Sequence, residues 1–536
     1  MMKRILVFVL PLLSVGLFFL AMLQVAPLVI PLDAPFGMTS VLPITYWGGL
    51  ALLVTASILL VSSEMFGEQV YQSFIVLFVL YFVGPVTIEP NARMPDSYWP
   101  LGETANVILK SGFVNIGGSL SGFQSWPAFN FIMATLHLVT GFSLISIAKY
   151  WPVYCGVFFS LMAYASAKQF GCSSKVSFLV AVFALSLFWM PQTYAQPRVI
   201  ALLMSSAVFL FLKDSRLTLQ RTIAIGIILV AIAMTEATTS FVAVVIPLVI
   251  VGLVARRSDL IGLGVFGGSV TTMFVVFSGT GPNILATMFD ALKIQLTEKV
   301  NTALLHTLVP ITTSRLEIAY LRYYFLGLLA ALILLAIISY TTVMKNALKL
   351  RTRILLVWVA SLSVLAWFNY NGTPLILLNI TFAVIPASLL GGLALSSSNR
   401  LGTKRVTLAI LLLIFALPHM PATYATEATD QVLSSSLAVA HFYGSYGSVS
   451  LPVYTQLPAL LFYYNPQFDY YGHVFSVSGL QESNFRQIDN FIMDAQSDKA
   501  LKYGFGEDEP LQFITNHTLA FEKVYANQLA QVYSII

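Results

Sequence analysis

The stretch RTIAIGIILVAIAMTEATTSFVAVVIPLVIVGLVAR, residues 221–256, decides the fold class of this chain. Between its terminal arginines lie 34 residues, which would extend about 51 Å as one helix at 1.5 Å per residue. The hydrocarbon core of a membrane is about 30 Å thick, so the stretch is too long for one crossing and just long enough for two short ones. It predicts a helical hairpin whose basic ends lie on one face of a membrane and whose polar apex, residues 235–240, lies near the other face.

The composition of the whole chain supports the same fold class. Of its 536 residues, 57% are hydrophobic and only 10% are charged, whereas a soluble domain carries about 25% charged residues. A water-soluble globule has too little interior to hide this much apolar surface. The composition excludes a cytosolic enzyme, a nucleic-acid-binding protein and a disordered chain, and it indicates an α-helical polytopic membrane protein.

Other apolar segments have the length of a membrane span. The first follows Met1–Arg4 and continues to about residue 30, which is too long for a cleaved signal peptide and predicts a signal anchor. Counting this one, the sequence predicts about 13 crossings. The remaining segments are 43–63, 69–88, 143–167, 174–190, 198–212, 219–234, 237–255, 259–279, 316–344, 352–369, 374–396 and 405–421.

Basic residues occur in alternate connections between these segments, and the positive-inside rule places such connections in the cytoplasm. The rule predicts a cytoplasmic N-terminus and a tail outside the cell membrane. One connection, 63–69, departs from the pattern because it carries Glu64 and Glu68. The basic connections are Lys3/Arg4, Lys168/Lys175, Lys213/Arg216/Arg221, Arg256/Arg257, Lys345/Lys349/Arg351/Arg353 and Arg400/Lys404/Arg405.

The charge balance divides the chain into two predicted domains. Residues 1–424 carry 24 basic and 12 acidic side chains, and residues 425–536 carry 4 basic and 11 acidic ones. The tail also lacks an apolar run of spanning length, so it predicts a small external α/β domain. Its predicted elements are strands at 449–454 and 473–478, a helix at 484–495, and a final hairpin of 522–525 with 530–536.

Two large external loops are predicted, at 89–126 and 280–315. In the first, Asp96 or Ser97 is placed to cap a helix with Pro100 in its first turn, and an apolar stripe predicts that this helix lies flat on the membrane. The second contains another amphipathic helix, and we expect the two loops to cover a shared cavity. The segment 127–140 is apolar but too short to span, which predicts a re-entrant or interfacial piece.

One stretch of the first loop resembles a known family. Ser97-Tyr98-Trp99-Pro100-Leu101-Gly102-Glu103, a glycine-rich run at 112–122, and Ser125-Trp126-Pro127-Ala128-Phe129 follow a few N-terminal spans. This pattern is similar to that of archaeal integral-membrane glycosyltransferases of the GT-C superfamily. The resemblance covers the architecture of 1–424 and, more specifically, the stretch 89–129. The Trp-Trp-Asp signature of oligosaccharyltransferase catalytic subunits is absent.

The resemblance implies transfer of a hexosyl group from a polyprenyl-phosphate donor to a glycan or protein acceptor outside the membrane. It also implies an acidic residue in the first loop as the general base. The family often has an adjacent acidic pair there, and this loop has none, so the choice between Asp96 and Glu89 stays open. Asp96 is the favoured base, and Glu89 or Glu103 would assist it.

The remaining site candidates follow from the chemistry of such a donor. Arginines near the interface suit its phosphate; the candidates are Arg93, Arg198, Arg315 and Arg322. Residues expected to line the site are Glu236, Gln196 and Trp99. The sequence has no zinc-ligand spacing, and it leaves a divalent cation undecided. For any single residue, the competing interpretation is an ordinary solvated loop charge. For the whole protein, the competing hypotheses are a non-catalytic GT-C-like scaffold or a transporter. Transporters usually carry ionisable residues inside their spans, and the spans of this sequence have almost none, which counts against a transporter.

Overall fold

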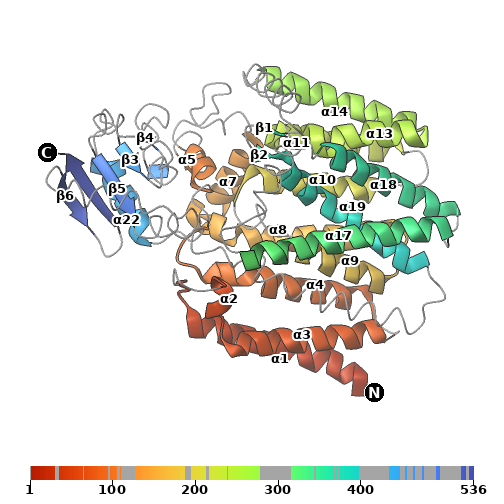
Figure 1. The fold of residues 1–536 in the computed structure, drawn as a ribbon, viewed down its shortest axis with the longest axis horizontal. Helices are drawn as coiled ribbons and strands as arrows, with labels where there is room; N and C mark the ends of the chain where they lie inside the picture. Colours follow the sequence, from red (N-terminus) through yellow and green to blue (C-terminus); the bar gives the residue numbers. More distant parts are fainter. Residues whose placement is uncertain are drawn as a thin grey trace.

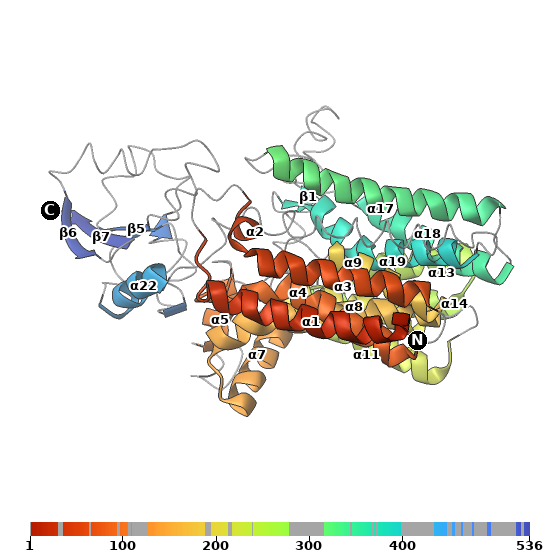
Figure 2. The same ribbon diagram turned by 90° about the horizontal axis from the view of Figure 1, so that it is seen from below.

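In the computed structural model of the protein, helices run along one long axis, and a small sheet lies beyond one end of the bundle they form (Figure 1). The view turned by 90° about that axis also shows the sheet beyond the same end of the bundle (Figure 2). The structure describes residues 2–30, 36–63, 66–93, 97–105, 109, 127–187, 195–212, 217–237, 240–277, 316–342, 346–365, 369–370, 373–397, 434–446, 453–455, 463–464, 474–475, 490–494, 521–526 and 530–535.

The N-terminal helices pack through a small polar contact. The Tyr81 hydroxyl donates to the carbonyl of Ser14 (2.6 Å), and the Ser14 hydroxyl donates to the carbonyl of Gly49 (2.8 Å). These bonds join three helices in a region without water, where a satisfied polar group specifies the packing. The elements of this part are α1 (Met2–Val25), α2 (Met38–Val41), α3 (Ile44–Ser62), α4 (Glu68–Val83) and the 3-10 helix η1 (Gly84–Ile88).

Replacing Gly49 by alanine is expected to destabilise this contact by about 1–3 kcal/mol, the usual effect of overpacking. A Cβ at Gly49 would overlap the Tyr81 hydroxyl oxygen, so the ring has to move. The neighbouring Gly48 is a matched control, because a Cβ there would meet only Leu17, at 4.0 Å. Thermal unfolding of both variants in detergent checks this prediction, and equal melting temperatures would contradict it.

The rest of the bundle consists mainly of helices that pack against their neighbours in sequence, because short connections favour antiparallel pairs. Examples are α8 with α9 and α13 with α14. The stretch 221–256 contains α11 and a second helix that begins with the π-helical segment η6 and continues as α13; the two helices meet at the predicted apex, between Thr235 and Ser240. The elements are α8 (Leu144–Gln169), α9 (Ser174–Ser186), α10 (Pro197–Phe211), α11 (Leu219–Thr235), η6 (Ser240–Val245), α13 (Ile246–Ala255), α14 (Ser258–Phe277), α17 (Leu316–Thr342), α18 (Asn346–Leu365), β1 (Asn369–Tyr370), β2 (Thr373–Pro374) and α19 (Leu375–Ser397).

Each predicted span from the N-terminal one to 374–396 coincides with helical structure, and 405–421 lies outside the described residues. The first helix ends at Val25, five residues earlier than predicted; beyond it the Leu28 amide donates to the carbonyl of Ile88 (2.9 Å). The chain is therefore a mostly helical, multi-pass membrane protein, while the number of crossings remains a prediction. Among the described helices, five are long and apolar enough to cross a membrane: Lys3–Val25, Ile44–Ser62, Glu68–Ile88, Leu144–Gln169 and Ser258–Phe277.

The segment 127–140 forms one helix, α7 (Pro127–Thr140). Its 14 residues are fewer than the roughly 20 needed to span a bilayer, and the helix lies across the long axis of the bundle (Figure 2). Large apolar side chains near its end, Leu138 and Val139, are exposed. These features agree with an interfacial helix, and its depth in the membrane stays a prediction.

The connection that departed from the charge pattern has a structural explanation. Glu68 begins α4, and its carboxylate lies 2.7 Å from the Lys168 ammonium at the end of α8. The acidic residue is therefore paired with a basic residue from one of the predicted cytoplasmic connections. Arg351 of α18 donates to the carbonyl of Phe170, and Arg353 donates to the carbonyl of Val254 (3.0 Å). These basic connections meet at the end of the bundle that holds the N-terminus (Figure 1).

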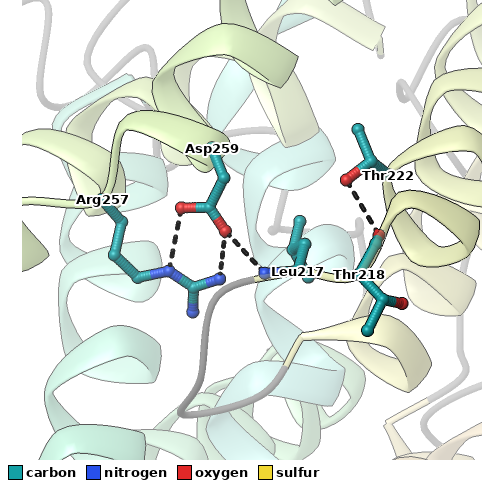
Figure 3. Close-up of polar contacts among 5 residues, drawn as sticks. All are labelled: Leu217, Thr218, Thr222, Arg257 and Asp259. Atoms are coloured by element: carbon teal, nitrogen blue, oxygen red, sulfur yellow. Dashed lines mark hydrogen bonds and ion pairs between the residues drawn. The ribbon is translucent and has the colours of Figure 1, made fainter.

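A second ion pair fixes the start of α14 at the same end. Two nitrogens of the Arg257 guanidinium donate to the two oxygens of Asp259, at 3.2 and 2.6 Å (Figure 3). Asp259 also accepts from the backbone amide of Leu217 (2.9 Å), just before α11. A bidentate arginine–carboxylate pair has a defined geometry, so this contact fixes the first turn of α14 beside the entry to α11.

The C-terminal residues form a five-stranded sheet with strand order β4-β3-β5-β7-β6. β3 pairs in parallel with β4 and β5, and β7 pairs antiparallel with β5 and β6. The sheet and α22 lie beyond the bundle end that carries α7 (Figure 1). The elements are α22 (Ser434–Tyr446), β3 (Val453–Thr455), β4 (Val474–Phe475), β5 (Asn490–Asp494), β6 (Phe521–Ala526) and β7 (Ala530–Ile535).

Two predictions in this part have different outcomes. The final hairpin is present, since Ala526 pairs with Gln531 across β6 and β7. The predicted helix at 484–495 is wrong over its second half, where β5 lies between β3 and β7. Pairing on both sides satisfies the backbone of β5, and such tertiary pairing overrides a local helical pattern. The predicted boundary at 424 lies outside the described residues.

Candidate functional site

The first candidate residues follow η1 and are buried. The 3-10 helix η1 ends at Ile88. The next residue, Glu89, has an extended backbone, and Arg93 follows four residues later. The Arg93 Nε atom is 3.9 Å from a Glu89 carboxylate oxygen, and the two side chains are 3% and 1% exposed. Isolated charges are costly to bury, so buried charges are normally paired. Glu89 and Arg93 are therefore not ordinary solvated loop charges, as the alternative hypothesis had supposed.

A third charged residue belongs to this group. Lys149 of α8 lies close enough to Glu89 to interact with its charge. We call these three residues the Glu89 group. Basic side chains in a low-dielectric region attract an anion such as a phosphate.

The helix that follows, α5 (Tyr98–Glu103), is held differently from the prediction. Ser97 does not cap it; its hydroxyl donates instead to the carbonyl of Arg93 (2.8 Å). The helix is also buried in the protein along most of its length, Leu101 included, and its orientation relative to the membrane stays a prediction. An apolar stripe indicates burial but does not distinguish lipid from protein as the partner. The favoured base, Asp96, lies outside the described residues.

Glu103, at the end of α5, is 1% exposed. The next residue, Thr104, donates to the side-chain oxygen of Asn130 on α7 (3.1 Å), and both residues are buried. Trp99 is half-buried on the same helix. The structure therefore buries two of the three predicted acidic candidates in the protein: Glu89, which precedes α5, and Glu103, its last residue.

A second ion pair is formed by Arg198 and Glu236, which were predicted as site residues for separate reasons. Arg198 Nε lies 3.3 Å from a Glu236 carboxylate oxygen, with side chains 35% and 15% exposed. Arg198 is in the first turn of α10, which begins at Pro197 after the half-buried Gln196, and Glu236 follows the last turn of α11. Each charge lies at the helix end whose dipole disfavours it, so helix stability alone does not explain the pair.

The helix α7 connects the surroundings of these two polar groups. It contacts α5 and α8, which carry Glu103 and Lys149, and also α10 and α11, whose ends carry the Arg198–Glu236 pair. The helix that follows α11 in the chain begins with the π-helix η6, a type of irregularity frequent at functional sites. The candidate site is therefore the end of the bundle around α7.

Residues from the C-terminal part complete this region. The Tyr98 ring of α5 meets Tyr463 edge-to-face (5.6 Å between centroids), Tyr463 meets Tyr464 (5.1 Å), and Tyr464 meets His441 of α22 (4.9 Å). Burial raises the pKa of Tyr98 well above its ordinary value, so the phenol stays neutral. The Asn91 side chain also donates to Ser434 at 3.4 Å. The hydropathy pattern of the sequence contains no signal for this contact between α5 and the C-terminal part.

Some predicted residues are not placed. The loop 280–315, with Arg315, lies outside the described residues, and of Arg322 only the position on α17 is described. The shared cavity under the two loops therefore remains a prediction. Within the described ranges, no three His, Cys, Asp or Glu side chains are grouped as a metal site.

Comparison with known proteins finds solved structures of similar fold. No protein-family model matches the chain, and no curated protein matches its sequence. The crystal structure of ArnT from Cupriavidus metallidurans in the apo state is 12% identical, with a TM-score of 0.52, and the match covers 87% of this chain and 98% of that one. The structure of the same protein bound to undecaprenyl phosphate gives the same identity and coverage, with a TM-score of 0.54.

An archaeal oligosaccharyltransferase from Archaeoglobus fulgidus is also similar, at 12% identity, a TM-score of 0.48, and coverage of 87% of this chain and 73% of that one. The chain thus has a fold similar to that of ArnT. At this identity the likeness concerns the fold alone.

Proposed function

We propose that the protein is a membrane glycosyltransferase that moves a sugar from a polyprenyl-phosphate donor to a hydroxyl of a glycan or protein acceptor on the outer face of the membrane. The observation that carries the proposal is the Glu89 group, in which the buried Glu89–Arg93 pair lies near the half-buried Lys149, on a GT-C fold. Buried charge at the end of a helix bundle is costly to maintain, and the basic side chains of this group suit a donor phosphate.

In the proposed reaction, the acidic and the basic residues have different roles. The bond between the anomeric carbon of the sugar and the donor phosphate breaks, and the acceptor oxygen forms the new glycosidic bond. The acceptor proton passes to Asp96, while polyprenyl phosphate leaves with the bonding electrons. Arg93 and Arg198, with Arg315 and Arg322 as further candidates, would stabilise the phosphate charge as it develops.

Glu89 has a different task in this proposal. Its carboxylate lies beside the Arg93 guanidinium, so in this proposal Glu89 orients Arg93, and Asp96 remains the base. Glu103 and Trp99 on α5 would contact the substrates, and Gln196 and Glu236 would line the opposite side.

The proposal places this site outside the cell, since the basic connections gather at the opposite end of the bundle. We expect a membrane-impermeant maleimide to label Ala438→Cys in α22 on intact cells. Ser258→Cys, at the start of α14, should be labelled only after permeabilisation. Both positions are exposed, and both native cysteines, Cys155 and Cys172, are buried. Labelling in the reverse order would contradict the orientation.

A donor panel tests the proposed activity. Purified protein is incubated with polyprenyl phosphates carrying different sugars and with host membrane extracts as acceptors, and released polyprenyl phosphate is measured. We expect release with one donor class only, dependent on the acceptor extract. Absence of release with every donor would favour the non-catalytic scaffold, and transmembrane movement of an intact donor would favour a transporter.

A further inference from the structure

The segment between η1 and α5 carries the charged residues of the candidate site. We call residues 89–98 the acidic segment; it contains Arg93 and the proposed base, Asp96. The Ser97 hydroxyl donates to the Arg93 carbonyl (2.8 Å), and the Tyr98 hydroxyl donates to the Ala92 carbonyl (3.3 Å). Each bond joins residues on either side of Asp96 in the sequence, so a shift of Ser97 or Tyr98 would also shift the chain that carries the base.

Two side chains from the C-terminal part contact the acidic segment. The Tyr463 ring meets the fully buried Tyr98 ring edge-to-face, at 5.6 Å between centroids, which is a favourable geometry for two aromatic rings. The Ser434 hydroxyl, at the start of α22, accepts from the Asn91 side chain (3.4 Å). One contact lies near the start of the acidic segment and the other at its end. Figure 1 shows α5 and α22 where the bundle and the sheet meet.

Tyr463 is itself held by the C-terminal part. Its ring meets Tyr464 at 5.1 Å, and Tyr464 meets His441 of α22 at 4.9 Å. Burial raises the pKa of Tyr463 to about 12, so its phenol is neutral at physiological pH and its contact with Tyr98 does not depend on charge. A series of edge-to-face rings therefore connects α22 with α5.

Tyr98 connects this series with the charges of the site. Glu89 lies close enough to Tyr98 to interact with it electrostatically. Tyr98 has no exposed surface, so a substrate does not reach its ring, and the ring acts on a reaction only by fixing its neighbours. Tyr463 is half-buried. A direct contact between Tyr463 and a substrate is therefore the alternative that an experiment has to exclude.

We propose that Tyr463 is a positioning residue: by packing against Tyr98, it fixes the acidic segment and thereby the alignment of Asp96 and Arg93. This inference rests on the proposed function. It adds that the C-terminal part sets the geometry of the reacting groups in the bundle. Alignment of this kind has a large effect on rate, because a displacement of about 1 Å can cost about 10²-fold.

Steady-state kinetics tests the proposal. Tyr463→Leu keeps an apolar side chain but loses the ring contact, and it should lower kcat about 10²-fold while the KM values for donor and acceptor stay unchanged. Tyr463→Phe keeps the ring and should have the wild-type kcat. A raised acceptor KM with unchanged kcat in Tyr463→Leu would show that Tyr463 contacts the substrate. An equal loss of kcat in Tyr463→Phe would show that its hydroxyl is required. Either result would overturn the proposal.

A double-mutant cycle tests whether Tyr463 acts through Tyr98. If it does, Tyr98→Leu should lower kcat as Tyr463→Leu does, and the double variant should be no slower than Tyr98→Leu alone, because residues in contact are not additive. Losses of kcat that multiply in the double variant would overturn the proposal, since they would show two independent roles.

Hydrogen–deuterium exchange of the full-length protein separates this inference from the proposed function. In Tyr463→Leu, amides of the acidic segment should exchange about two- to tenfold faster, the effect of losing one aromatic pair. Amides of α3 should be unchanged, and Tyr463→Phe should match the wild type throughout. If the wild type transfers no sugar but the exchange changes in this way, the proposed function fails and the hold of Tyr463 on the segment stands. If the wild type transfers sugar and the exchange of the segment is the same in Tyr463→Leu, the positioning role is overturned.

Discussion

Replacing Asp96 by asparagine is expected to reduce sugar transfer about 10²- to 10⁴-fold, the usual contribution of a general base. Asparagine has nearly the same shape and caps a helix as well as aspartate, but it does not accept the acceptor proton. Expression and thermal unfolding should therefore equal those of the wild type. The measurement is the initial rate of transfer by purified protein, together with its melting temperature.

The competing assignment makes Glu89 the base. If Asp96→Asn keeps near-full transfer while a Glu89 substitution loses it without a loss of stability, the chosen carboxylate is the wrong one. If neither substitution changes transfer, a carboxylate outside this segment accepts the proton. The melting temperature has to be measured with the transfer rate, because the Glu89 substitution alone is expected to affect folding and could lose transfer for that reason.

Replacing Glu89 by glutamine is expected to lower stability by about 3–5 kcal/mol, the effect of breaking a buried ion pair from one side. Glu89 and Arg93 are almost fully buried, and Lys149 lies beside them. Removing the charge of Glu89 leaves the buried Arg93 guanidinium beside a neutral amide. The measurement is thermal unfolding in detergent, and transfer should fall with the folded fraction.

A double variant provides the control for this second prediction. In Glu89→Gln/Arg93→Gln both partners of the pair are neutral, so much of the lost stability should return, because replacing both ends of a buried pair is far less costly than removing one. Transfer should not return, since Arg93 is a proposed phosphate ligand. A double variant less stable than either single variant would show that the two side chains contribute independently.

The spans could be predicted because apolar length is a local property of the sequence. The stretch 221–256 gave its helices and its turn directly, since no partner is needed to place 34 largely apolar residues between two arginines. The end of the first helix could not be placed in this way: it stops at Val25, although the residues after it stay apolar. Apolar character alone does not set a helix end.

Several residues of the candidate site could be predicted from the sequence, but the contacts between them could not. Arg198 and Glu236 were both named, for separate reasons, and only the packing of α10 against α11 brings them together. The Tyr98–Tyr463 contact joins residues far apart in the sequence, for which periodicity has no signal. The error at 484–495 has the same origin, because the partners of β5 lie in other strands.

One measurement tests the central claim most directly. The wild-type protein is reconstituted in liposomes containing a polyprenyl-phosphate sugar of the class selected by the panel, radiolabelled in the sugar, and acceptor extract is added outside. The account predicts equal amounts of labelled acceptor and released polyprenyl phosphate from wild-type protein, and neither product above background from Asp96→Asn. Labelled acceptor without released polyprenyl phosphate, or no labelled acceptor from correctly folded wild-type protein, would contradict it.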